Sequence, residues 1–177
     1  IAIELTRLQD DVPPFTGALA RQLIEQAYGE ALEQHFSMFD DEPMASASIA
    51  QVHRAQLHDG TRVVVKVLRP EVEKQIDRDL KLLYTLARFA HKYWSEGERL
   101  RPVEVVDEYN KTIHDELDLM REASNASKLR SNFENSAIIY VPEIYWQHTR
   151  RDVMVMEEVT GIPIRDVEAI RKAGIDM

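Results

Sequence analysis

Two β-rich segments joined by a tight turn constrain the fold of this chain more than any other feature. The segments are residues 49–57 and 61–68, and His58-Asp59-Gly60 joins them. An Asp-Gly pair between such runs is typical of an antiparallel β-hairpin. Pro70 ends the second strand, because proline lacks the N–H that a sheet ladder needs. The rest of the chain therefore has to pack around a hairpin.

Helical patterns lie on both sides of this hairpin. Spaced apolar residues and helix-end signals predict four helices, at residues 5–11, 16–28, 71–94 and 102–132. Thr16 is the expected N-cap and Gly29 the expected end of the second helix, and Pro102 occupies the first turn of the fourth. The two long helices carry one-sided apolar stripes, so each needs a surface to pack against.

Two further strands and a short helix are expected near the C-terminal end. The strands are predicted at residues 138–147 and 152–157, and the helix ends near Ala173 after a linker at Gly161 and Pro163. Helices and strands that follow one another in separate groups indicate an α+β fold. The sequence begins without methionine and stops just past a helix-end glycine, so we expect it to be a piece of a longer polypeptide.

Composition argues against several classes of function. The formal charge of −9, from 31 acidic and 22 basic residues, argues against nucleic-acid binding, which needs a basic surface. The absence of cysteine excludes disulfides, thiolate-bound zinc and thiolate nucleophiles, and it fits a cytosolic compartment. The apolar runs are too short to span a bilayer, so we expect this piece to be soluble. Histidines and carboxylates lack metal-ligand spacing, so we assign no metal.

Lys66 is the first candidate for chemistry. It lies within the strand Val63-Val64-Val65-Lys66-Val67, on the face that also carries Val64 and Leu68. A buried ammonium is costly unless it meets an anion. Lys66 is therefore either a phosphate-binding lysine, like the one in the kinase Val-Ala-Ile-Lys motif, or an edge-strand lysine in water.

A segment of mostly small residues before this strand is the second candidate. Its members are Met44, Ala45, Ser46, Ala47, Ser48, Ile49, Ala50, Gln51 and Val52. It links two strand candidates, where a kinase has the glycine-rich loop that covers ATP phosphates, yet it contains no glycine. Alanine allows close backbone approach but resists the positive φ angles that glycine adopts freely. The alternative is a plain loop of small residues.

An acidic segment at residues 115–122 is the third candidate. On a continuous helix, Asp115, Asp118 and Glu122 fall within one narrow stripe. This stripe is either a solvated helix face or the source of a carboxylate that crosses to Lys66.

Taken together, these segments resemble the UbiB type of atypical protein-kinase-like proteins, a family associated with ubiquinone biosynthesis. The most specific match is Ala45-Ser46-Ala47-Ser48-Ile49-Ala50-Gln51-Val52-His53, because no ordinary kinase has an alanine-rich loop there. Further matches include Val64-Val65-Lys66-Val67-Leu68-Arg69-Pro70 and Asp115-Glu116-Leu117-Asp118-Leu119-Met120-Arg121-Glu122. The resemblance covers essentially the whole chain.

The resemblance implies a nucleotide site. The segment from Met44 to Val52 would form the alanine-rich nucleotide loop, and Lys66 would contact the α- and β-phosphates. The hinge beside the adenine would consist of Glu157, Glu158 and Val159. The catalytic aspartate and the Mg²⁺-binding aspartate of the family are expected beyond Met177, so no catalytic or metal-binding residue is expected within this chain.

Three carboxylates match structural or regulatory positions of the family. Glu122 would be the helix glutamate that pairs with Lys66, and Glu116 and Asp118 would be the Glu-x-Asp pair that meets an upstream Lys-x-Gly-Gln segment. On a regular helix Glu116 and Asp118 lie about 200° apart. Both can therefore face one ligand only if the helix is distorted, or else their partners differ.

The resemblance also implies a domain organisation. Residues 1–35 would be an N-terminal helical extension, and residues 162–177 the start of the linker to a C-lobe. Between them, residues 36–161 would form a protein-kinase-like N-lobe, with a small antiparallel sheet, the long helix that carries the kinase glutamate, and an inserted helix at 71–94.

The implied function is an ATP- or ADP-binding lobe of an atypical kinase or ATPase that supports ubiquinone biosynthesis. The full-length protein would transfer phosphoryl groups or hydrolyse ATP with Mg²⁺, which this piece alone is not expected to do. Expected partners are the nucleotide and ubiquinone-biosynthesis proteins or lipid intermediates, and other parts of the protein would contact the cytoplasmic face of the bacterial inner membrane. A pseudokinase-like scaffold or partner-binding module stays open, as does a helical adaptor with a stray hairpin.

Overall fold

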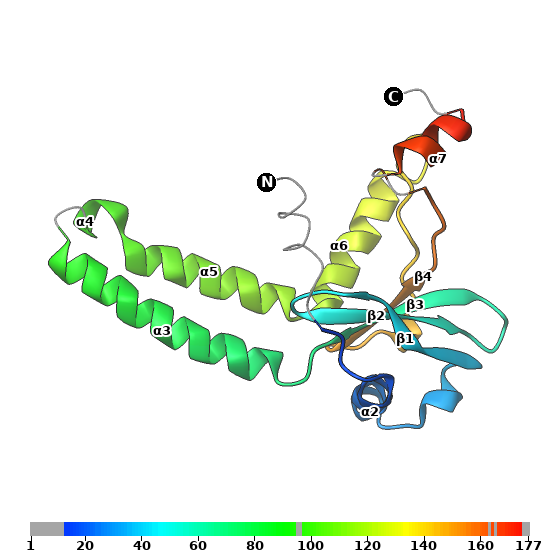
Figure 1. Ribbon diagram of the computed structural model, residues 1–177, viewed down its shortest axis with the longest axis horizontal. Helices are drawn as coiled ribbons and strands as arrows, with labels where there is room; N and C mark the ends of the chain where they lie inside the picture. The colour runs from blue at the N-terminus through cyan, green and yellow to red at the C-terminus, as the bar shows by residue number, and fades with distance from the viewer. Residues whose placement is uncertain (1–12, 95–96, 163, 165, 175–177) are drawn as a thin grey trace.

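The computed structural model describes residues 13–94, 97–162, 164 and 166–174. Within them, four strands form one antiparallel sheet in the order β1 (Met38–Ser46), β2 (Ala50–Gln56), β3 (Arg62–Leu68) and β4 (Val153–Glu157). The helices are α2 (Gly17–Tyr28), α3 (Val72–Tyr93), α4 (Gly97–Leu100), α5 (Pro102–Glu116), α6 (Leu119–Asn132) and α7 (Val167–Lys172), with the 3-10 turns η1 (Leu32–Gln34) and η2 (Trp146–His148) (Figure 1). The predicted α+β class is confirmed.

The Asp59-Gly60 turn joins β2 to β3, as the sequence predicts. The Leu57 N–H donates to the Thr61 carbonyl at 2.9 Å, and Gly60 has a φ of 88°, a left-handed conformation that glycine adopts without steric cost. The register of this hairpin places Val52 directly opposite Lys66.

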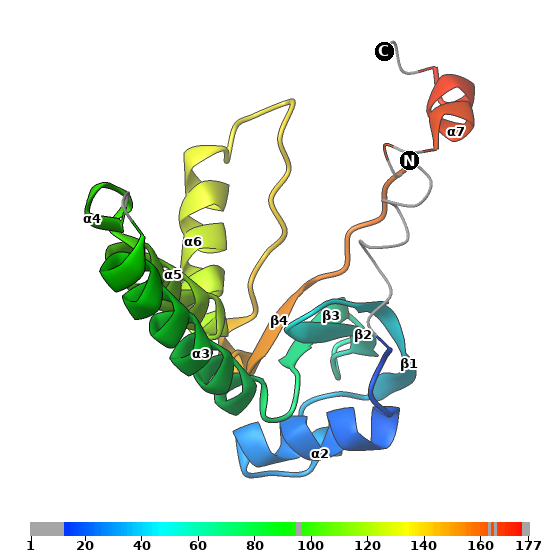
Figure 2. The same cartoon turned by 60° about the vertical axis from the view of Figure 1, so that its left-hand side comes forward.

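Different helices cover the two faces of the sheet (Figure 2). On the face toward α2, Ala20 and Ile24 of the helix pack in one buried apolar cluster with Val63, Val65, Val153 and Val155 of the sheet. The opposite face packs on α6 through Ala50, Leu68, Leu119, Ala123 and Met154. Because side chains alternate along a strand, the face toward α6 also receives Lys66.

α3 and α5 form a helical hairpin that extends away from the sheet (Figure 1). Leu80 and Ala87 of α3 are buried in it. The Tyr84 hydroxyl donates to the Asp107 carboxylate at 2.6 Å and accepts from the Asn110 amide at 3.2 Å. The long helix predicted at residues 71–94 is thus confirmed, and its apolar stripe packs on α5.

The single helix predicted at residues 102–132 is wrong, because the chain breaks between α5 and α6. The Leu119 N–H donates to the Arg151 carbonyl at 2.9 Å, outside any helix. The Asp118 side chain accepts from the Met120 N–H at 3.0 Å and so caps the new helix. Leu117, between the two helices, is buried. Asp118 was the sequence signal for this break, but the regular apolar spacing on both sides of it suggested one continuous helix.

The strand predicted at residues 138–147 is also wrong. This segment pairs with β4 only at one isolated bridge, Ile144 to Met156, flanked by a bond from the Tyr145 N–H to the Val155 carbonyl. Pro142 cannot donate a hydrogen bond, and such a residue disfavours a continuous ladder. The strand predicted at residues 152–157 is confirmed as β4.

The remaining helix predictions are mostly confirmed. Thr16 caps α2 by accepting from the Leu19 N–H at 3.3 Å, and Gly29 ends it with a φ of 74°. The short helix before Ala173 is α7. The helix predicted at residues 5–11 and Pro163 of the predicted linker lie outside the described residues. In the described part of the chain, no helix combines the length and apolarity needed to cross a membrane.

Candidate functional site

Lys66 and Glu122 form an ion pair between β3 and α6. The Lys66 ammonium lies 2.8 Å from Oε1 and 2.7 Å from Oε2 of the Glu122 carboxylate. The Lys66 side chain is 20% exposed and that of Glu122 is 40% exposed, so the pair is open to solvent on one side. The structure thus contains the expected pairing of these two residues, and Lys66 is not an edge-strand lysine in water.

The break before α6 explains why Glu122 reaches Lys66. Because Asp118 caps the helix, Glu122 lies in the first turn of α6, where a negative charge is favoured by the helix dipole. Leu119 and Ala123 are fully buried against the sheet and fix the direction of the helix. The carboxylate therefore points along the sheet surface to the ammonium.

The other carboxylates of the acidic segment have different surroundings. The predicted stripe of Asp115, Asp118 and Glu122 is wrong, because it assumed a continuous helix. Asp115 pairs with Arg121, and Asp118 serves as the α6 cap. Within the described residues Glu116 is exposed and its carboxylate contacts no partner. A shared ligand for Glu116 and Asp118 stays a prediction.

The alanine-rich segment forms the tip of the β1–β2 hairpin rather than a long loop. Met44, Ala45 and Ser46 end β1, and Ala50, Gln51 and Val52 begin β2. Only Ala47, Ser48 and Ile49 lie between the strands, and the Ala47 N–H donates to the Ala50 carbonyl at 2.9 Å. Ala50 and Val52 lie on the same sheet face as Lys66.

Gln51 and His53 lie on the opposite face, and both are completely buried. The Gln51 amide accepts from the Phe15 N–H and donates to the Phe15 carbonyl, each at 3.0 Å. It also lies 2.9 Å from His53 Nε2, while His53 Nδ1 lies 2.8 Å from the Asp40 carbonyl. Burial lowers the pKa of His53, and because a carbonyl oxygen can only accept, the contact with Asp40 requires a proton on Nδ1. The predicted contact of Gln51 with a nucleotide on the Lys66 side can involve only its backbone.

The predicted hinge begins at Glu157, the last residue of β4, and both of its carboxylates have partners. Glu157 accepts from the Tyr140 hydroxyl at 2.6 and 2.5 Å, a bond that raises the pKa of Tyr140. Glu158 pairs with Arg54 at 3.1 Å and with Arg62 at 2.8 Å. Val159 is exposed. The Glu157 and Glu158 N–H groups are engaged too, with the Glu143 carbonyl at 2.9 Å and the Arg62 carbonyl at 3.2 Å. Of the predicted hinge, Val159 is the residue best placed to contact a ligand.

Arg69 is a contact residue that the sequence analysis missed. Its guanidinium donates to the Ala47 carbonyl at 2.8 Å and to the Ser46 hydroxyl at 2.7 Å, at the tip of the β1–β2 hairpin. The only signal in the sequence was its place directly after β3 and before Pro70, within one of the matched strings.

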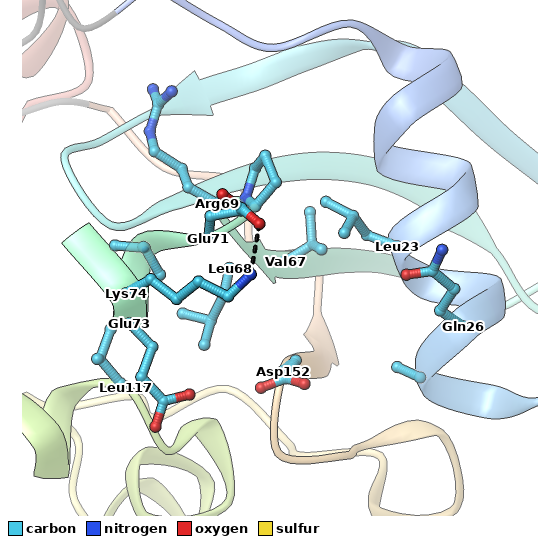
Figure 3. A pocket seen from close by; sticks show the side chains of 13 residues that line it. Leu23, Gln26, Val67, Leu68, Arg69, Glu71, Glu73, Lys74, Leu117 and Asp152 are labelled. Atoms are coloured by element: carbon cyan, nitrogen blue, oxygen red, sulfur yellow. Dashed lines mark hydrogen bonds and ion pairs between the residues drawn. The ribbon is translucent and has the colours of Figure 1, made fainter. Parts of the chain in front are cut away.

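A cavity of about 490 Å³ lies apart from this site, between α2, the end of β3 and the start of α3 (Figure 3). Leu23, Val67 and Leu117 form apolar walls, and Asp152 and the Lys74–Glu71 ion pair lie at its border. Neither Lys66 nor Glu122 lines it. Among the described residues, no group of three or more histidine and carboxylate side chains is arranged to hold a metal ion.

Comparisons with known proteins agree with one another. The family model of the ABC1 atypical kinase-like domain matches residues 7–177. The chain is 58% identical over 177 residues to "Probable protein kinase UbiB" of Marinobacter nauticus, and 54% identical over 176 residues to the protein of the same name from Pseudomonas paraeruginosa. These alignments cover 100% and 99% of this chain but 32% and 33% of the relatives. The chain thus spans about a third of their length.

A solved structure supports the fold directly. The Mycobacterium tuberculosis protein Rv3197, solved in a complex with erythromycin, superposes with a TM-score of 0.71 at 30% identity, over 90% of this chain and 39% of that one. The sheet and its helices thus have the architecture of a kinase-like N-lobe.

Proposed function

Since this chain belongs to the ABC1 atypical kinase-like family, we propose that it binds ATP or ADP as the N-lobe of a longer kinase-like protein. The observation that carries this proposal is the Lys66–Glu122 ion pair. A half-buried cation held by a carboxylate on one side and open to solvent on the other suits a phosphate oxygen as its next partner. Glu122 would orient the ammonium and Lys66 would bind the α- and β-phosphates.

The surrounding backbone fits the same ligand. The turn at residues 47–49 lies at the end of the sheet that carries Lys66, where the small side chains of Ala47 and Ser48 would let the backbone approach phosphate groups. At the other end of the site, the segment at residues 157–159 would contact the adenine, chiefly through the exposed Val159. Mg²⁺ would neutralise phosphate charge in the complete protein, held by residues from the two thirds of the relatives' length that this chain does not cover.

For the complete protein we propose ATP-dependent phosphoryl transfer or ATP hydrolysis in support of ubiquinone biosynthesis. The relatives' name, "Probable protein kinase UbiB", supports this assignment. Its partners would be ubiquinone-biosynthesis proteins or lipid intermediates, at the cytoplasmic face of the bacterial inner membrane.

A non-catalytic binding module is the second candidate, favoured by one surface. Leu82, Leu86, Phe89 and Tyr93 repeat at helical spacing along α3 and are all strongly exposed. An apolar stripe of this kind is a common contact surface for another protein or for a lipid. In this case Lys66 would be dispensable.

Nucleotide binding to the complete protein separates the two candidates. We expect calorimetry with Mg-ATP and Mg-ADP to show binding that Lys66→Ala weakens by about tenfold or more, because a charged hydrogen-bond donor is lost. Lys81→Ala is the matched control, since Lys81 is an exposed lysine on α3. Equal affinity in the wild type and in Lys66→Ala would contradict the phosphate-binding role of Lys66. If the wild type binds no nucleotide, the result favours the binding module.

A further inference from the structure

We propose that Arg69 is a positioning residue that holds the turn at residues 47–49 in place relative to Lys66. The inference rests on the proposed nucleotide site and adds to it a residue that would act without touching the nucleotide. It also gives a role to the segment at residues 13–15, which contacts both Gln51 and Arg69 just before α2 begins.

Arg69 holds the turn with both its backbone and its side chain. Its N–H donates to the Ile49 carbonyl at 2.9 Å. Its guanidinium donates to the Ala47 carbonyl at 2.8 Å through Nε and to the Ser46 hydroxyl at 2.7 Å through Nη2. Three of the four residues from Ser46 to Ile49 are therefore fixed by one arginine.

The same guanidinium also holds the segment at residues 13–15. Nη1 donates to the Pro13 carbonyl at 3.2 Å, and the guanidinium carbon lies 5.7 Å from the centre of the Phe15 ring. From the other side, the buried Gln51 amide fixes both backbone groups of Phe15. The turn, this segment and the end of β3 thus form one hydrogen-bonded unit centred on Arg69.

The absence of glycine gives this arrangement a physical reason. A glycine-rich loop can fold down over phosphates because its backbone reaches conformations closed to other residues. The turn at residues 47–49 lacks that freedom, so it has to be held in its working position beforehand. Arg69 follows Lys66 by only three residues. This short separation would keep the turn at a fixed distance from the lysine that would bind the same phosphates.

The contacts also predict which substitutions matter. Arg69→Lys can keep one donor but cannot span Ser46, Ala47 and Pro13 together, because an ammonium lacks the planar fork of a guanidinium. Arg69→Gln loses the charge and most of the reach. Arg78→Gln is the matched control, since within the described residues the Arg78 side chain donates only to the Lys74 carbonyl of its own helix, at 3.2 Å.

Two measurements on the complete protein test the proposal. In the nucleotide-free protein, hydrogen exchange at the Ala47 amide should accelerate by about tenfold or more in Arg69→Gln, by less in Arg69→Lys and not at all in Arg78→Gln. Calorimetry with Mg-ADP should show affinities that fall in the same order. In the same calorimetry, the losses of Mg-ADP affinity caused by Arg69→Gln and Ser46→Ala should be non-additive in the double mutant, because the two side chains share one hydrogen bond.

The outcomes separate this inference from the proposed function. If the wild type binds Mg-ADP and Lys66→Ala weakens binding, but Arg69→Gln changes neither exchange nor affinity, the positioning role is overturned while the nucleotide site stands. If the wild type binds no nucleotide, the proposed function fails, and with it the positioning role of Arg69 in nucleotide binding. Faster exchange with weakened affinity, intermediate in Arg69→Lys, supports both.

Discussion

The sheet and the α3–α5 hairpin differ in how they are held together. The sheet has a fully buried apolar core that includes Ile24 of α2 and Val65 of β3. In the hairpin α5 contributes no fully buried residue, and α3 contributes only Leu80 and Ala87. Figure 2 shows the hairpin leaning away from the sheet, with its base next to the start of α6.

This difference indicates two levels of stability in one chain. The sheet gains from the transfer of large apolar side chains out of water, which is the dominant favourable term in folding. The hairpin depends on a narrow seam and on polar contacts at its surface, such as the Tyr84–Asp107 hydrogen bond and the His114–Asp77 pair at 3.3 Å. Regions with few buried contacts open locally at lower free energy than the core.

The largest expected effect is at the centre of the sheet core. Ile24 is 0% exposed, so Ile24→Ala should lower the free energy of unfolding of this region by about 2–5 kcal/mol, through lost burial and the cavity left behind. Urea unfolding of the complete protein, followed by hydrogen exchange in β2, β3 and β4, measures this loss. A loss below about 1 kcal/mol would contradict the contrast drawn between the two regions.

A smaller effect is expected where the two regions meet. Asp118→Ala should destabilise the first turn of α6 by about 1 kcal/mol, because the Met120 N–H loses its acceptor. Hydrogen exchange across residues 119–122 should rise while exchange in β3 stays unchanged.

Asp118→Asn is the matched control for this substitution, since asparagine also caps helices well. If it exchanges like the wild type, capping accounts for Asp118. If it is as damaging as Asp118→Ala, the carboxylate has a further partner, as the family resemblance predicts for the Glu116 and Asp118 pair.

The smallest effect is expected on the outer face of the hairpin. Leu86 is 56% exposed, so Leu86→Ala should change the free energy of unfolding by no more than about 0.5 kcal/mol. The same urea and exchange measurements apply, with Leu80→Ala on the buried side of α3 as the control that should cost more. A large loss at Leu86 would mean that this stripe is covered in the complete protein, and would sharpen the case for a docking role.

Much of the fold followed from local patterns in the sequence. The Asp59-Gly60 turn, the caps at Thr16 and Gly29 and the stripe of α3 each depend on a few adjacent residues, and each was predicted correctly. The errors arose where tertiary contacts decide. The Arg151 carbonyl accepts from the Leu119 N–H where α6 starts, and an isolated bridge replaces a strand beside β4.

The site was predicted unevenly for the same reason. The Lys66–Glu122 pair could be anticipated because a lysine among valines requires an anion and the family resemblance supplied one. The burial of Gln51 on the far face and the reach of Arg69 across the hairpin could not, because both depend on where residues 13–15 cross the sheet. No periodicity in the sequence encodes that crossing.

The capped start of α6 has a mechanical consequence. The Arg151 carbonyl and the Asp118 side chain accept from the first two amides of α6, so the helix starts without hydrogen bonds from α5 to these amides. α3 has 22 residues, so the hairpin is about 33 Å long, and a swing of ~10° about its base would carry its tip by about 6 Å. That motion would pull on the Asp115–Arg121 ion pair, which joins α5 to α6 one residue before Glu122. The hairpin would thus act as a lever on the helix that carries the partner of Lys66.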